Sequence, residues 1–268
     1  MAVQAQLTPL SFLTKIFFPC FVLLLPHVNS TSFSFNTFYP NMGGISFQGD
    51  AFSSSGVLQL SRNQIDNNLT YSAGRASYIR PVHIWDAQTG RLTDFTTRFS
   101  FIAKDVKDPT IYGDGLTFFL APLESEIPPK AVGGYLALFS PETALNASKA
   151  NQIVAVEFDS YSNPWDPSYD HVGINVNSIF SVAEVMWKNN IYDGAVVNAW
   201  VNYDSVTKNL SVFVSDAQNP VFRGVYSFSY TVDLSDVLPE WARIGFSAST
   251  GTAVETNGIL SWEFYSTL

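Results

Sequence analysis

The fold is decided by two neighbouring stretches, VAVEFDSYSNPWDP at residues 154–167 and HVGINV at residues 171–176. Side chains on a β-strand point alternately to the two faces of a sheet. Glu157 and Asp159 therefore share one face of the first stretch. In the second stretch, the valines and the isoleucine lie on the face opposite His171. We predict two strands that each have an apolar face and a polar face, joined by a loop that prolines hold away from helical conformations.

The polar residues of this segment are potential metal ligands. An oxygen-rich set with one imidazole suits a transition ion such as Mn²⁺, and it consists of Glu157, Asp159, Asp166 and His171. An all-oxygen set suits Ca²⁺, and Asp159, Asp166, the Asn163 amide oxygen and a loop carbonyl supply it. Because the sets share aspartates, we predict two adjacent ions. The alternative without metal is a plain hairpin whose polar residues face water.

The same residues resemble the metal segment of the legume lectins. In that family it reads Val-Ala-Val-Glu-Phe-Asp-Thr-aromatic-x-Asn-x-x-Asp-Pro, followed by His-Ile-Gly-Ile-x-Val-Asn-Ser. This chain differs conservatively, with Ser160 in place of Thr and Val172 in place of Ile. The resemblance extends from about Thr31 to Leu268, and it implies a non-enzymatic, metal-dependent carbohydrate-binding protein.

The composition favours strands, and the absence of a linker, a low-complexity tract or an internal repeat in the sequence predicts one domain. Hydrophobic residues make up 46% of the chain and charged residues 14%, and there are 22 Phe and 12 Tyr, which favour strands. Short strands separated by turn residues predict an antiparallel sandwich or jelly roll. The resemblance specifies a jelly roll with a flat back sheet and a curved front sheet that carries the metal loops. The net charge of −9 argues against a nucleic-acid partner.

Further strands are expected along the chain at 32–35, 57–60, 95–101, 116–120, 135–139, 196–203, 210–214, 226–232, 243–247 and 260–265. A short helical turn is expected at 236–241. We expect Trp187 and Trp262 to be core residues.

Residues 1–30 are interpreted as a secretory signal peptide, which leaves 31–268 as the single carbohydrate-binding domain. Lys15 is the only charged residue in the first range, and the apolar run at 16–25 is too short to span a bilayer. The alternative is a membrane anchor; no later stretch is apolar enough for an integral span. The secretory route predicts a secreted or vacuolar glycoprotein, with N-glycosylation sequons at Asn68, Asn146 and Asn209.

The resemblance also implies a shallow sugar site. Asp114, which follows a cis peptide bond in the family, would accept hydrogen bonds from two ring hydroxyls. Gly134 would offer its N–H, since glycine allows close backbone approach. Asn163 would place its oxygen on Ca²⁺ and its NH₂ on the sugar. Tyr161 would give its carbonyl to Ca²⁺ and its ring to the sugar face.

Two further elements of the site follow from the resemblance. Thr252 and Ala253, in the loop at 249–258, would present backbone N–H groups, and the shortness of this loop is similar to mannose- and glucose-binding relatives. Galactose-binding relatives tend to have longer loops, and galactose is the alternative sugar. Ser181 matches a serine that holds a Mn²⁺-bound water.

The partners implied are mono- and oligosaccharides or glycoproteins. The family's back-sheet pairing suggests a homodimer or homotetramer, with 32–35 and the C-terminal strand at the interface.

Parts of the sequence also resemble two other functional classes. A jelly-roll glycosidase would use the motif Glu-x-Asp-x-x-Glu, which begins at Glu157 and Asp159. A retaining mechanism needs a second carboxylic acid, but Ser162 stands at the last position of the motif and Asn163 follows it. A sugar-blind storage or defence protein would typically have lost metal ligands or sugar loops, and this chain retains them.

Overall fold

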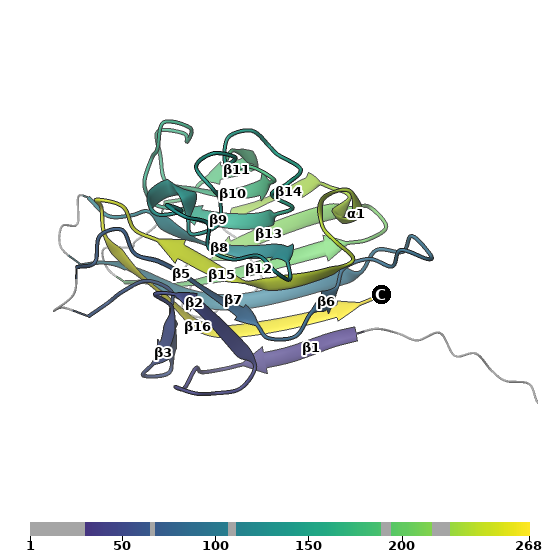
Figure 1. The fold of residues 1–268 in the computed structure, drawn as a ribbon, viewed down its shortest axis with the longest axis horizontal. Helices are drawn as coiled ribbons and strands as arrows, with labels where there is room; N and C mark the ends of the chain where they lie inside the picture. Colours follow the sequence, from purple (N-terminus) through teal and green to yellow (C-terminus); the bar gives the residue numbers. More distant parts are fainter. Residues whose placement is uncertain (1–29, 65–67, 107–110, 189–193, 216–225) are drawn as a thin grey trace, which may run out of the picture.

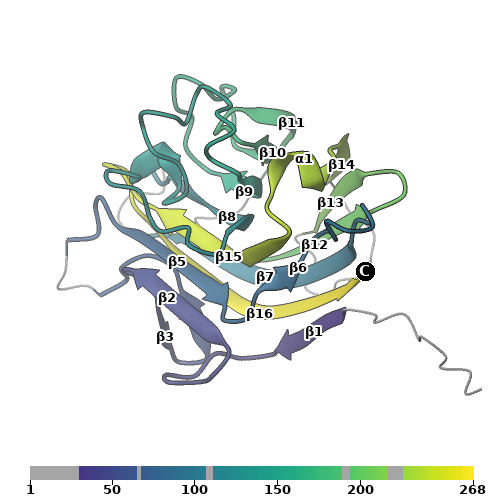
Figure 2. The same cartoon turned by 45° about the vertical axis from the view of Figure 1, so that its right-hand side comes forward.

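The computed structural model describes residues 30–64, 68–106, 111–188, 194–215 and 226–268. Two antiparallel β-sheets face each other, and long loops lie over the outer face of one of them (Figures 1 and 2). The predicted signal peptide lies outside the described residues, except for Ser30, where β1 begins.

The first sheet, which we call the back sheet, contains the long C-terminal strand. β16 pairs along its length with β7, and also with β1 and β4. The strands follow the order β14 (Tyr226–Thr231), β13 (Asn209–Ser215), β12 (Val196–Asp204), β7 (Asp94–Asp105), β16 (Glu255–Thr267), β4 (Val57–Gln59) and β3 (Phe52–Ser54), and β1 (Ser30–Phe35) lies beside β16.

The second sheet, the front sheet, contains both halves of the metal segment as neighbouring strands. Its order is β11 (Ser181–Met186), β10 (His171–Val176), β9 (Val154–Asp159), β8 (Gly115–Pro122), β15 (Trp241–Ser249), β5 (Ala73–Tyr78) and β2 (Ile45–Gly49), and β6 (Val82–His83) pairs with β15. Neighbours in both sheets are often far apart in sequence, as expected for a jelly roll. The all-β fold class is confirmed.

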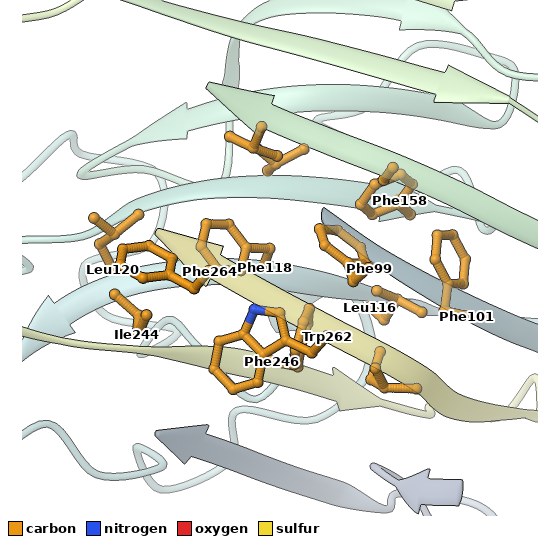
Figure 3. Close-up of a cluster of buried hydrophobic side chains, with 14 of the residues drawn as sticks. Phe99, Phe101, Leu116, Phe118, Leu120, Phe158, Ile244, Phe246, Trp262 and Phe264 are labelled. Atoms are coloured by element: carbon orange, nitrogen blue, oxygen red, sulfur yellow. The ribbon is translucent and has the colours of Figure 1, made fainter. Parts of the chain in front are cut away.

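Aromatic side chains fill the space between the two sheets (Figure 3). Phe246 of the front sheet makes edge-to-face contacts with Phe99 and Trp262 of the back sheet, with ring centroids 4.9 and 4.8 Å apart. Such pairs add to the free energy gained by burying the rings. The Trp262 indole N–H donates to the Thr97 hydroxyl over 3.0 Å. Trp187 and Trp262 are both buried in this core, as predicted.

A smaller cluster covers the outer face of the front sheet. Every residue of β8 from Gly115 to Ala121 is buried, because alternate side chains pack either into the main core or under the loops. Phe119 and Ala155 point outward and are covered by apolar residues of the 131–153 segment, including Leu136, Leu138 and Phe139. This two-sided burial explains why the sequence of β8 is continuously apolar.

Two predicted elements are wrong. The segment expected to be a strand at 135–139 is instead a 3-10 turn, Gly133–Tyr135, followed by turns, because Leu136 and Ala137 adopt left-handed conformations with φ of 53° and 54°. The helical turn expected at 236–241 lies earlier, at α1 (Leu234–Val237). Its N-cap Asp233 accepts a hydrogen bond from the Ser235 N–H, and β15 already begins at Trp241.

Replacing Phe99 by alanine should destabilise the protein by about 3–5 kcal/mol, because its ring touches Phe101, Phe118, Phe158 and Phe246 and its loss leaves a cavity. Denaturant unfolding monitored by fluorescence measures this change. The same substitution at Phe47, which is 37% exposed, is the control and should cost no more than about 1 kcal/mol. Equal losses for both variants would contradict this account of the core.

Candidate functional site

One row of paired residues crosses four strands at the same end of the front sheet. Ser249 of β15 pairs with Gly115 of β8, Gly115 pairs with Asp159 of β9, and Asp159 pairs with His171 of β10. Asp114 directly precedes this row. The register therefore brings the predicted metal segment, the predicted sugar-binding aspartate and the start of the 249–258 loop to one place.

The predicted manganese ligands include three deeply buried side chains. Glu157, Asp159 and His171 are 0%, 1% and 1% exposed, and His171 Nε2 lies 3.2 Å from Glu157 Oε1. The Ser181 hydroxyl donates to the same Glu157 oxygen. Ser181 thus lies beside a predicted ligand. Asp166, the fourth predicted ligand, is half-buried.

The pKa values of these groups show how unfavourable their negative charges are. Burial raises the pKa of Asp159 well above its ordinary value, and the charges of Asp166 and Glu157 add to this. Burial likewise raises the pKa of Asp166 to about 7. Burial alone would lower the pKa of His171, but the hydrogen bond and charge of Glu157 raise it overall. The cluster therefore stabilises positive charge, either protons or bound cations.

Several buried polar atoms of the cluster have no hydrogen-bond partner among the described residues: Glu157 Oε2, Asp159 Oδ2, Asp114 Oδ2 and His171 Nδ1. Buried polar groups are usually satisfied. A carboxylate or imidazole that faces a metal ion would have the ion as its partner in place of a hydrogen bond. The donor set therefore fits the predicted ions.

Three oxygen atoms converge at the loop after β9. The Asn163 side-chain oxygen faces Asp166 Oδ2 at 3.1 Å and the Tyr161 carbonyl at 3.3 Å, and only a rotated amide would donate hydrogen bonds to them. Backbone contacts hold the loop, because the Asn163 N–H donates to Asp166 Oδ2 and the Tyr161 N–H donates to Asp159 Oδ1, both over 2.9 Å. An all-oxygen set of this kind matches the chemistry of Ca²⁺.

Asp114 lies beside this oxygen set. The Gly113–Asp114 peptide bond is cis. The Asp114 N–H donates to the Ser249 carbonyl over 3.2 Å, and the Asp114 carbonyl accepts from the Ser160 N–H over 3.1 Å. Burial raises the pKa of the Asp114 carboxyl to about 7, and the Gly251 N–H opposes this shift. The main chain thus fixes the position of a buried carboxylate.

Glycines surround the two polar side chains predicted to contact sugar. A Cβ on Gly134 would overlap the Asn163 amide, and a Cβ on Gly251 would lie 3.0 Å from Asp114 Oδ2. Glycine at 134 therefore allows the backbone close to the Asn163 amide, and any side chain at 251 would crowd Asp114. Tyr161 is 36% exposed, so it is available to stack on a ligand. Of the two remaining predicted residues, Thr252 is exposed and Ala253 is buried.

Glu255 is a buried acid beside this site to which the sequence assigned no role. It is fully buried, and the Ser160 hydroxyl donates to Glu255 Oε2 over 2.7 Å. Burial raises the pKa of Glu255 to about 8, although hydrogen bonds from Ser160 and Asn257 oppose this. The alternation of Glu255, Asn257 and Ile259, all buried in β16, is the signal that could have placed it on the inner face.

A second group of metal-capable side chains lies elsewhere. One ligand atom each of His83, Asp86 and Glu240 lie within 4.8 Å of one another, at the Trp241 end of β15. Asp114 lies near the Ser249 end, about 26 Å away at 3.3 Å per residue. This group is therefore separate from the predicted Ca²⁺ and Mn²⁺ ligands.

The sequence profile of the legume lectin domain matches residues 30–267. The chain belongs to the legume lectin family. It is 48% identical to "Lectin 7" of Medicago truncatula, with 99% of each chain covered. Among solved structures, the lectin UEA-II in complex with galactose superposes with a TM-score of 0.80 at 42% identity, covering 89% of this chain and 99% of that one. Lectin I from Ulex europaeus, in complex with the methyl glycoside of α-L-fucose, gives a TM-score of 0.80 at 36% identity, covering 88% and 98%.

Family membership decides against the glycosidase. Legume lectins bind carbohydrate and are not enzymes, so this lectin is not a glycosidase. Asn68 and Asn146 of the predicted sequons are exposed, and Asn209 is half-buried in β13. Among the described residues, none of the helices is long and apolar enough to cross a membrane.

Replacing Glu255 by glutamine should flatten the dependence of stability on pH. The raised pKa means that the folded lectin binds this proton more tightly than the unfolded chain does. Stability is therefore lost as the pH rises from about 4.5 through about 8, by up to ~1.4 kcal/mol per pH unit. Glutamine imitates the neutral acid, so thermal melts should show the variant gaining on wild type as the pH rises from about 4.5 to about 8. Glu263→Gln, at an exposed position of the same strand, is the control; parallel profiles for wild type and Glu255→Gln would refute this assignment.

Proposed function

We propose that this lectin binds a single sugar residue in a shallow site whose shape depends on adjacent Ca²⁺ and Mn²⁺ ions. The observation that carries the proposal is the burial of three carboxylates and one imidazole around unpaired oxygen atoms. The family generally binds these two metals. Bound cations would neutralise the buried carboxylates and hold the Asn163 oxygen on the metal side. Glu157, Asp159, Asp166 and His171 would hold Mn²⁺, and Asp159, Asp166, Asn163 and the Tyr161 carbonyl would hold Ca²⁺.

The sugar is recognised by groups that surround Asp114. The Asp114 carboxylate accepts hydrogen bonds from two ring hydroxyls, and the Gly134 N–H donates one. With its oxygen held on the metal side, the Asn163 amide turns its NH₂ toward the sugar. The exposed Tyr161 ring packs on the apolar face of the sugar, and the 252–253 backbone closes the other side. Charged hydrogen bonds of this kind contribute about 1.5–3 kcal/mol each.

Two alanine substitutions separate the sugar-binding role from the metal-binding role. Asp114→Ala should lower sugar affinity at least about 100-fold, because two charged hydrogen bonds are lost, and should keep Ca²⁺ binding. Asp159→Ala should lose both metals and the sugar together, as should treatment with a chelator. Titration calorimetry with Ca²⁺ and with sugar measures both, and Asp236→Ala, at an exposed position, is the control. Full sugar affinity in chelator-treated, metal-free lectin would defeat the proposal.

The sugar preference is tested separately. The short 249–258 loop predicts mannose or glucose, whereas the complexes of the two solved relatives favour galactose or fucose. Retention on immobilised mannose, with elution by free mannose before galactose, is the result expected from the loop. Preferential elution by galactose would contradict that prediction and support the alternative. A metal-loaded lectin that binds no sugar on a glycan array would instead support the sugar-blind storage or defence protein.

The proposal also includes the secretory pathway and an oligomeric state. We infer a secreted or vacuolar glycoprotein, and the exposure of Asn68 and Asn146 is compatible with glycans at both positions. We also infer a homodimer or homotetramer that pairs through the back sheet, where Tyr265 on the C-terminal strand leaves an exposed aromatic ring.

A further inference from the structure

Arg75, on β5 of the front sheet, is a buried cation. It is 2% exposed, and it forms no salt bridge within the part of the chain that the structure describes. Burial lowers the pKa of Arg75 to about 9, and the charge of Arg243 adds to this. Burying a charge without a counter-ion is unfavourable, and an apolar residue of similar size would fill the space more cheaply. The charge therefore has a use other than packing.

The guanidinium of Arg75 binds backbone carbonyls on the segment that covers the front sheet. Its Nε donates to the Ala137 carbonyl over 2.6 Å, and its Nη2 donates to the Leu138 carbonyl over 3.2 Å. Its Nη1 donates to the Ser125 hydroxyl over 2.9 Å, and the guanidinium carbon lies 5.3 Å from the centre of the Phe119 ring. The planar guanidinium of arginine donates hydrogen bonds to several acceptors at fixed angles, which the ammonium group of lysine cannot do.

These carbonyls belong to a tight turn that cannot satisfy them as a strand would. Leu136 and Ala137 have positive φ, so neither residue can join a β-ladder. Within the turn, the Leu136 N–H donates to the Gly133 carbonyl over 3.0 Å, and the Ala137 N–H donates to the Ala131 carbonyl over 2.9 Å. The residues at 131–138 therefore form one hydrogen-bonded unit, and Arg75 binds the end of it that carries Ala137 and Leu138.

The front of the same unit reaches the sugar site. The Gly133 carbonyl accepts from the Ser249 hydroxyl over 2.6 Å, and the Gly133 N–H donates to the Thr250 carbonyl over 3.1 Å. Gly134 lies against the Asn163 amide. The unit thus spans the distance from Arg75 to the groups around Asp114.

We propose that Arg75 is a positioning residue of the sugar site, which acts by clamping the 131–138 turn so that the Gly134 N–H stays in place beside Asn163. The inference rests on the proposed sugar-binding role of Gly134. Arg75 does not touch the sugar in this scheme. Its guanidinium sets where the donor lies, and loss of the clamp leaves the metals bound and the donor displaced.

The test compares Arg75→Met, Arg75→Lys and the control Arg243→Met in the full-length, metal-loaded protein. Arg75→Met removes every donor but fills a similar volume, and it should weaken sugar binding at least about tenfold while Ca²⁺ affinity changes by less than about threefold. Arg75→Lys, which keeps the charge and part of the hydrogen bonding, should be intermediate and covers the case in which the methionine variant does not fold. Arg243→Met should bind sugar as wild type does. Calorimetry well below each melting temperature measures these affinities.

Hydrogen exchange of the amides at 131–139 gives a readout independent of sugar. Exchange there should be faster in Arg75→Met, with the amides of β12 in the back sheet unchanged. Unchanged sugar affinity together with unchanged exchange, or a lower melting temperature with full sugar affinity, would overturn the proposal and leave Arg75 a purely structural residue. A wild-type lectin that binds no sugar would defeat the proposed function, and the exchange result would still decide whether Arg75 holds the turn.

Discussion

The site depends on one electrostatic constraint: the carboxylates of Asp114, Glu157, Asp159 and Asp166 are gathered at one end of the front sheet and largely shielded from water. Like charges in such surroundings repel strongly and lose their hydration. The site can exist only with compensating positive charge. Protons supply it by binding carboxyls whose pKa values are raised, and metal ions can supply it at neutral pH. The polar end of the sheet is therefore built around cations.

The register of the strands brings these carboxylates together. Packing on both faces of the front sheet shields them from water. The row from Ser249 to His171 is fixed by hydrogen bonds that run across four strands. On the inner side the strands rest on the aromatic core. On the outer side, the turn at 131–138 covers Phe119. Arg75 binds this turn at the Ala137 carbonyl, and Ser249 binds it at the Gly133 carbonyl. Packing on both faces of the sheet therefore holds these groups in place.

The sequence predicted most strands and the shared polar face of Glu157 and Asp159, because a period of two is a direct consequence of strand geometry. It was wrong at 135–139, since an apolar run that lies over a sheet looks the same as one that lies within it. β11 was missed because its hydrophobic residues do not alternate with polar ones, and Val182 and Met186 are exposed. The order of strands in the sheets was not derivable from periodicity, and the family resemblance implied only the two sheets of a jelly roll. Arg75 and Glu255 were missed because their roles arise only from contacts with distant segments.

The row of paired residues has a consequence for how the protein matures. Gly115 and Ser249, which meet in that row, are separated by most of the domain, so the fold has high contact order and is expected to assemble slowly. A nascent chain from which β15 has not yet emerged lacks Ser249 and the loop that follows it. We therefore expect a chain that still lacks β15 to bind no glycan at the proposed site.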